Sequence, residues 1–247
     1  SNIFKTRELR VHPQKDDKIL SDWNGLMISA LARASVILDN KDYYDAAKKS
    51  ADFIIDNLFD DDGGLLKRYR NGHSGIKAMI EDYAFFIWGL IELYQAQFDS
   101  KYISIAANLS DYQIEHFWDF DNKGFFFTSD IGENLFIRNK EIYDGAIPSG
   151  NSVSAYNYIR IGRILSRYDY EEISYDIVDA FTPTLNRYSS GSTMLLHAID
   201  FMQGPSYEII IKGDRKKSND IIKSIQKNAQ PNKVLIFNSD SNKMFAF

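Results

Sequence analysis

The sequence predicts a mainly α-helical fold, part of an (α/α) toroid of helical hairpins that carries a small C-terminal βαβ unit. Segments that are apolar on nearly every face alternate with amphipathic segments, and short turns join them. A toroid has this pattern because its inner helices are surrounded by protein whereas its outer helices face solvent. The arrangement also recurs: Gly64 and Gly124 precede similar apolar runs 60 residues apart. This period exceeds the roughly 33 to 47 residues of common helical solenoids.

The first hairpin follows residues 3–20, which are polar and irregular and are predicted to form a loop. Residues 24–38 are apolar on nearly all faces, which predicts a buried helix. Residues 41–59 place their apolar side chains on one stripe and their charges on the other, which predicts an outer helix. A turn at residues 60–64 and a short strand-like run at residues 65–69 complete this unit.

Two further hairpins repeat the order of a buried helix followed by an amphipathic one. Their predicted helices cover residues 81–98, 101–117, 149–165 and 171–187. Pro183 is expected to end or kink the last of them, because proline has no backbone N–H and its ring clashes with the preceding turn. Residues 193–202 predict one more short helix.

The composition changes after Gly204 and Pro205. A β-rich run, an amphipathic helix and a second β-rich run follow, at residues 207–212, 216–228 and 234–237. This order predicts a βαβ unit. We place a boundary here, which gives a helical portion at residues 1–204 and an α/β unit at residues 205–247. Two strands form a poor independent sheet, so the unit is expected to pack on the helices.

Composition excludes several classes of function. The 247 residues carry a net charge of −5, which argues against nucleic acid and membrane surfaces as partners. The absence of cysteine excludes disulfides and thiolate chemistry in this segment and fits a cytoplasmic protein. No apolar run approaches the ~20 residues of a membrane span. The four histidines lack ligand spacing, so the sequence predicts neither a metal site nor a cofactor. Because the chain opens on Ser1 without a methionine, we expect a piece of a longer protein.

Polar motifs recur at one phase of the repeat, just before or at the start of each predicted inner helix. They are Asp22-Trp23-Asn24, Glu81-Asp82-Tyr83 and the stretch at residues 144–152. In the third motif Ser149 or Asn151 is placed to cap a helix, behind a turn formed by Gly145, Pro148 and Gly150. In a toroid the three motifs would lie on one rim around one cavity.

The mixture of carboxylates, amides and aromatic rings on this rim suits a polyhydroxylated ligand such as a sugar. Carboxylates accept hydrogen bonds from hydroxyl groups, and aromatic planes cover the apolar face of a sugar ring. The acids assigned to acid/base chemistry are Asp17, Glu81, Asp82 and Asp144. The residues assigned to ligand binding are Trp23, Asn24, Tyr69, Tyr83, Ser149, Asn151 and Ser152.

Each candidate also has a structural interpretation. Glu81 and Asp82 stand in the first turn of their helix, where acidic residues interact favourably with the helix dipole. Asp16 and Asp17, between lysines, also fit solvated charges, although the position of Asp17 before Trp23 and Asn24 favours a role in the site. Trp23 is more often a core anchor than a stacking platform when it is judged alone.

Three long runs carry a resemblance that covers most of the chain. They are DDKILSDWNGLMISALARAS at residues 16–35, YRNG followed by EDYAFFIWGLIELYQAQFD at residues 69–99, and KGFFFTS through DGAIPSGNSVSA at residues 123–155. These runs resemble the YyaL-type thioredoxin-domain-containing family, whose animal members are called spermatogenesis-associated proteins. The resemblance implies a thioredoxin-like domain, a six-hairpin glycosidase-like barrel and a small C-terminal α/β part. This chain would then lack the thioredoxin-like domain and the first hairpins.

Two hypotheses for function remain open at this point. The first is a carbohydrate-active domain that performs glycoside hydrolysis or sugar epimerisation in the full-length protein, with the fragment inactive alone. The second is a non-enzymatic scaffold that docks a partner or the upstream thioredoxin-like domain. An open half-ring would leave apolar flanks on its terminal inner helices, so we also expect self-association or contact with the missing upstream segment.

Overall fold

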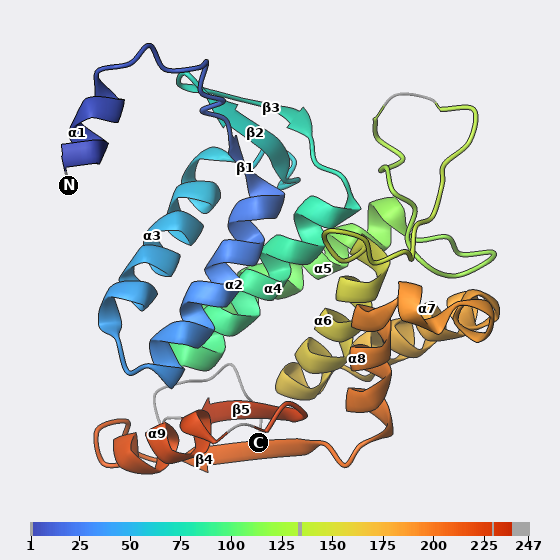
Figure 1. Ribbon diagram of the computed structural model, residues 1–247. Helices are drawn as coiled ribbons and strands as arrows, with labels where there is room; N and C mark the ends of the chain where they lie inside the picture. Colours follow the sequence, from blue (N-terminus) through green and yellow to red (C-terminus); the bar gives the residue numbers. More distant parts are fainter. Residues whose placement is uncertain (1, 133–134, 229, 239–247) are drawn as a thin grey trace.

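The computed structural model describes residues 2–132, 135–228 and 230–238, and three helical hairpins form its main body (Figure 1). Their helices are α2 (Ser21–Ile37) with α3 (Lys41–Asn57), α4 (Ile80–Gln97) with α5 (Ser100–Phe117), and α6 (Gly150–Leu165) with α7 (Tyr168–Arg187). A 3₁₀ turn at Ser189–Gly191 leads to α8 (Thr193–Gln203). All the predicted hairpins are present, with boundaries that differ by a few residues.

Helices α2, α4, α6 and α8 form an inner row in which each packs against the next. The outer helices α3, α5 and α7 pack on α2, α4 and α6 respectively. Nearly all side chains of α4 and α6 are buried, whereas α3 and α7 bury only one stripe. The predicted alternation of inner and outer helices is therefore confirmed.

Helix α2 differs from the other inner helices because it stands at the end of the row. On the side away from α4, Trp23, Met27 and Ile37 are 64%, 57% and 58% exposed. The prediction that this helix is buried on all faces is wrong here, since the described residues contain no inner helix that covers this side. An apolar flank on the first inner helix is what an open arrangement of hairpins predicts.

Two glycines allow α2 and α4 to lie unusually close together. A Cβ atom on Gly25 would lie 2.5 Å from the carbonyl carbon of Phe85 on α4. On the facing helix, a Cβ atom on Gly89 would lie 2.9 Å from the carbonyl oxygen of Gly25. Real Cβ atoms do not approach backbone atoms this closely, so the contact depends on glycine at these positions.

The helical hairpins carry a small antiparallel sheet above the N-terminus of α2 (Figure 1). Its strands are β1 (Ile19–Leu20), β2 (Leu66–Arg70) and β3 (His73–Lys77), in the order β1-β2-β3. The sequence predicted only β2, because β3 is exposed and contains no apolar alternation. Asn71 and Gly72 have φ values of 52° and 82° and form the tight turn that pairs β2 with β3.

Two other expectations are corrected. Residues 3–20 were predicted to be a loop, but the chain begins with the helix α1 (Asn2–Glu8), which has no buried residue. Pro183 lies inside α7, which continues to Arg187, so this proline does not end the helix. In the part of the chain that the structure describes, no helix combines the length and apolarity needed to cross a membrane.

The βαβ unit closes the end of the inner helices that lies opposite the small sheet (Figure 1). It consists of β4 (Tyr207–Lys212), α9 (Asn219–Lys227) and β5 (Lys233–Asn238), with the two strands parallel. Strand β5 packs on α4 and α6, and α9 packs on α2. The Gln95 side chain of α4 donates to the carbonyl oxygen of Leu235 at 2.7 Å and accepts from its N–H at 2.9 Å.

The expectation that this unit packs on the helices is therefore confirmed. The boundary at residue 204 stays a prediction. Parts of the two predicted units, namely residues 1, 133–134, 229 and 239–247, lie outside the described residues.

Candidate functional site

The three polar motifs lie at one end of the molecule, because α2, α4 and α6 run in the same direction. Their N-termini form a rim on the side away from the βαβ unit (Figure 1). Inner-helix neighbours bring the motifs together: α2 packs on α4, and α4 packs on α6. The contacts of each side chain then show which of the predicted residues are free to meet a ligand.

The α2 and α4 motifs are joined by a buried charge network. Asp82 is fully buried and accepts hydrogen bonds from Ser21 Oγ at 2.7 Å and from the Met79 N–H at 2.8 Å. The Lys67 Nζ of β2 lies 3.2 Å from Asp82 and 2.9 Å from the buried Asp22. Burial raises the pKa of Asp82, while the attraction of Lys67 opposes that rise. Asp82 thus links two helices and a strand, and sequence reasoning missed Lys67.

The side chains of the α6 motif form hydrogen bonds with the start of α6 and with the loop that precedes it. Ser149 caps α6, accepting from the Ser152 N–H at 3.1 Å, and both side chains are buried. The amide of Asn151 donates to the carbonyl oxygens of Phe125 and Glu141, both at 2.9 Å, and accepts from the Phe125 N–H at 2.8 Å. These three side chains fix the irregular segment that precedes α6.

Asp144 caps two helices at once. Its carboxylate accepts from the Ser149 N–H at 2.8 Å, at the start of α6, and from the Met194 N–H at 2.7 Å, at the start of α8. Both acceptor oxygens of this half-buried group are therefore engaged with backbone donors. The geometry gives Asp144 a structural task in joining α6 to α8.

The remaining ligand candidates are dispersed. The hydroxyl of the buried Tyr83 accepts from the Leu65 N–H at 2.8 Å. Tyr69 and Asn24 contact the outer helix α3: the Tyr69 ring lies 5.0 Å from that of Phe53, edge to face, and Asn24 accepts from Ser50 Oγ at 3.1 Å.

Two candidates are solvent-exposed. Asp17 forms an ion pair at 2.7 Å with Arg70 of β2. Trp23 is exposed on the free face of α2, so the core-anchor interpretation is wrong. The side-chain partners of Asp17, Tyr69 and Asn24 named here thus lie on β2 and α3, and none is an acid of α4 or of the α6 motif.

Glu81 differs from the other predicted acids, because its carboxylate is not engaged by another group of the described chain. It is half-buried in the first turn of α4, and the described residues provide its carboxylate with no hydrogen bond or ion pair. Burial raises its pKa, and the nearby charge of Glu141 raises it further. Glu141 is exposed in the loop before α6 and was not among the sequence candidates. Nothing in the sequence distinguishes it from a solvated charge, because its partner lies 60 residues away in the chain.

No protein-family model matches the sequence. Spermatogenesis-associated protein 20 of Rattus norvegicus is 32% identical over 246 residues, which cover 95% of this chain. The chain is a homologue of spermatogenesis-associated protein 20. It spans about a third of the length of such relatives, since the match covers 31% of the rat protein.

Solved structures similar to this homologue of spermatogenesis-associated protein 20 identify the fold. A cellobiose 2-epimerase from Bacillus thermoamylovorans matches with a TM-score of 0.58 and 16% identity, over 70% of this chain and 46% of that one. A GH76 α-mannanase from Bacteroides thetaiotaomicron matches with a TM-score of 0.60 and 13% identity, over 89% of this chain and 59% of that one. The chain therefore forms part of a glycosidase-like (α/α) toroid, as the alternation of its helices predicted.

Proposed function

We propose that this chain is part of a carbohydrate-active toroid, in which Glu81 acts as a general acid on a sugar or glycoside bound at the rim. The observation that carries the proposal is the state of Glu81: its side chain is half-buried, receives no hydrogen bond from the described residues, and has its pKa raised by burial. A raised pKa favours the protonated carboxyl group, which is the form that can donate a proton to a leaving oxygen. Toroids of this shape include an epimerase and a mannanase, by the names of the two neighbours.

Glu141 is the second carboxylate of the proposed site. It is exposed, and its charge acts on Glu81, so the two groups differ in environment. Acid/base reactions on sugars use such a pair, one group protonated and the other ionised. Hydrolysis and epimerisation both remain compatible with this pair. The site would be completed by the rest of the toroid, which is why we expect the chain alone to be inactive.

The Glu81→Gln substitution tests this proposal in a protein that carries the complete toroid. A screen of mannosides, cellobiose and free hexoses first identifies a sugar that the parent protein converts. We expect the turnover of this sugar to fall about 100-fold or more in the variant. Stability should change by less than roughly 0.5 kcal/mol, because no hydrogen bond to the carboxylate is lost. Steady-state rates and thermal unfolding measure the two effects.

Two comparison variants sharpen that test. Asp17→Asn removes an exposed acid and should leave turnover unchanged. Asp144→Asn should lower stability by about 1 kcal/mol through its helix caps, with a smaller effect on the chemical step. Unchanged turnover in Glu81→Gln would contradict the assignment.

A non-enzymatic scaffold is the second candidate, and one observation favours it. The polar atoms of Asp82, Asp144 and Asn151 form hydrogen bonds within the protein. This is expected if the rim no longer binds a substrate. Such a scaffold would dock a partner protein or an upstream thioredoxin-like domain. It predicts that no sugar is bound or turned over, in either the parent protein or the Glu81→Gln variant. A cytoplasmic location stays a prediction under both proposals.

We also propose that, in the isolated chain, a second copy covers the exposed apolar face of α2. Trp23, Met27 and Ile37 form this face, and burial of such side chains contributes about 1.5–3 kcal/mol each. Sedimentation velocity should therefore show a concentration-dependent dimer, and a Trp23→Glu/Met27→Lys variant should weaken it at least about tenfold. The control is Phe120→Lys, which removes an exposed apolar side chain from the loop after α5. A chain that stays monomeric, or a dimer that tolerates the double substitution, would count against this interface.

A further inference from the structure

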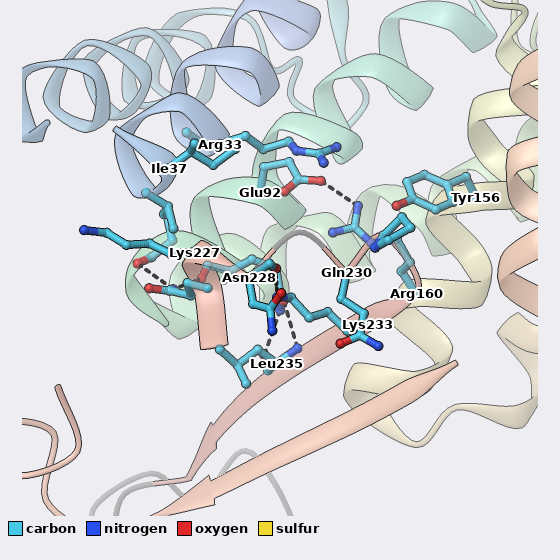
Figure 2. Close-up of a pocket in the computed structure, with 16 residues that line it drawn as sticks. Arg33, Ile37, Glu92, Tyr156, Arg160, Lys227, Asn228, Gln230, Lys233 and Leu235 are labelled. Atoms are coloured by element: carbon cyan, nitrogen blue, oxygen red, sulfur yellow. Dashed lines mark hydrogen bonds and ion pairs between the residues drawn. The ribbon is translucent and has the colours of Figure 1, made fainter. Parts of the chain in front are cut away.

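A cavity of about 280 Å³ lies at the end of the inner helices that is remote from the rim. The C-terminal halves of α2 and α4 line it together with α6, α9 and β5 (Figure 2). Glu92, on its wall, lies 11 residues beyond Glu81 on α4, about 16 Å along the helix axis. The cavity is therefore separate from the carboxylate pair proposed to act at the rim.

A buried ion pair forms the inner wall of this cavity. Arg160 Nη1 of α6 lies 2.7 Å from Glu92 Oε1 of α4, and both side chains are less than 10% exposed. The guanidinium group also lies 4.8 Å from the centre of the Tyr156 ring, and Trp88 Nε1 donates to Glu92 at 3.1 Å. Arg160 Nε, although buried, has no hydrogen-bond partner. This N–H has almost no accessible surface, so a ligand in the cavity would not reach it.

The cations of the cavity outnumber its single acid. Among the described residues that line it, Glu92 is the sole carboxylate, and it is engaged with Arg160. Lys227 pairs with Asp39, and Lys233 donates to backbone carbonyl oxygens. Arg33 extends from α2 over the same space (Figure 2) and forms no ion pair within the described chain. Among the described lining residues, Arg33 is therefore the guanidinium group without a counter-ion, and it lies beside the Glu92–Arg160 pair.

We propose that this cavity binds a small molecule that carries a carboxylate or phosphate group. Arg33 supplies an exposed cation, and Arg160 supplies a second positive charge in the wall, which its ion pair with Glu92 offsets. Arginine suits this task because its planar fork matches the geometry of carboxylate and phosphate oxygens. The volume lies at the low end of small-molecule sites, which restricts the ligand to about the size of one sugar ring or less.

Titrations of the 247-residue chain at constant ionic strength test the proposal with three probes: inorganic phosphate, glucuronate and glucose. We expect saturable binding of phosphate, glucuronate or both in NMR spectra, and no saturable binding of glucose. The anion that binds more tightly identifies the source of the oxyanion. Arg33→Gln should weaken anion binding about tenfold, as expected for the loss of a hydrogen bond from a charged donor. Arg187→Gln removes an exposed arginine of α7 and should leave binding unchanged.

Glu92→Gln provides a second test with an effect in the opposite direction. The amide still accepts from Trp88, but it releases Arg160, so anion affinity should rise about tenfold. The variant should melt at a lower temperature than the parent in the absence of anion, and phosphate or glucuronate should raise its melting temperature more than that of the parent. The proposal is overturned if neither anion binds saturably to the parent chain, if glucose binds as tightly as the anions, or if Arg33→Gln and Arg187→Gln behave alike. The Arg33 comparison remains decisive if Glu92→Gln does not fold.

Discussion

Gly25→Ala is expected to destabilise the chain by about 3 kcal/mol or more. In an ordinary helix interior this change stabilises by about 1 kcal/mol, because alanine is the better helix former. Here the new methyl group would lie 2.5 Å from the carbonyl carbon of Phe85 and 2.6 Å from its oxygen. Both are backbone atoms of the buried helix α4, which cannot move aside without disturbing α5 and α6. Urea unfolding followed by circular dichroism measures the change.

Two further glycine substitutions control for the effect of helix propensity. Gly89→Ala tests the same contact from the opposite side, since its Cβ would lie 2.9 Å from the Gly25 carbonyl oxygen. It should also destabilise. Gly75→Ala lies in the exposed strand β3, where the nearest heavy atom would be Arg68 Nη2 at 3.8 Å. This variant should match the parent within roughly 0.5 kcal/mol. A Gly25→Ala chain as stable as Gly75→Ala would refute the close packing of α2 on α4.

The helices were predictable because periodicity reports how much of each face is apolar, and burial follows apolarity in this chain. Periodicity does not report what covers a face. Met27 and Ile37 look as apolar in the sequence as Ile28, yet they are exposed while Ile28 is completely buried. Their exposure depends on the end of the helix row, which no local pattern records. For the same reason β3, which is held by its partner β2 and not by burial, gave no signal.

The position of the rim was predictable, but the tasks of its residues were not. Asp82, Asp144 and Asn151 have the polar atoms that bind a sugar hydroxyl, and the same atoms satisfy backbone N–H groups and hydroxyls of the protein. Residue type cannot separate these tasks, because both use the same hydrogen bonds. Arg160 did carry a signal that sequence reasoning passed over: an arginine flanked by apolar residues in the middle of a buried helix requires a partner. Glu92, at the equivalent depth on α4, is that partner.

Lys67→Met is expected to destabilise the chain by about 3–5 kcal/mol, because it leaves Asp22 and Asp82 buried side by side without a cation. Ser21 and the Met79 N–H would still donate to Asp82, but neither carries a compensating charge. The matched control is Arg70→Met, from the same strand. It breaks the exposed ion pair with Asp17 and should cost less than about 1 kcal/mol. Urea unfolding near neutral pH compares the two variants.

The pH dependence separates a charge effect from lost packing. Burial already raises the pKa of Asp82 in the folded chain above the ordinary aspartate value of 3.8, and removal of Lys67 should raise it further. The folded state then binds a proton more tightly than the unfolded state, so stability falls as pH rises from 3.8 through the raised pKa. The loss of unfolding free energy caused by Lys67→Met should therefore be smaller near pH 5 than near pH 8.

Addition of Asp82→Asn to Lys67→Met should recover part of the loss near pH 8 and remove most of that pH dependence, since asparagine keeps an acceptor for Ser21 without the charge. A deficit that is equal at both pH values, and unchanged by Asp82→Asn, would show that Lys67 contributes through its aliphatic stem and not as the counter-ion of α2 and α4.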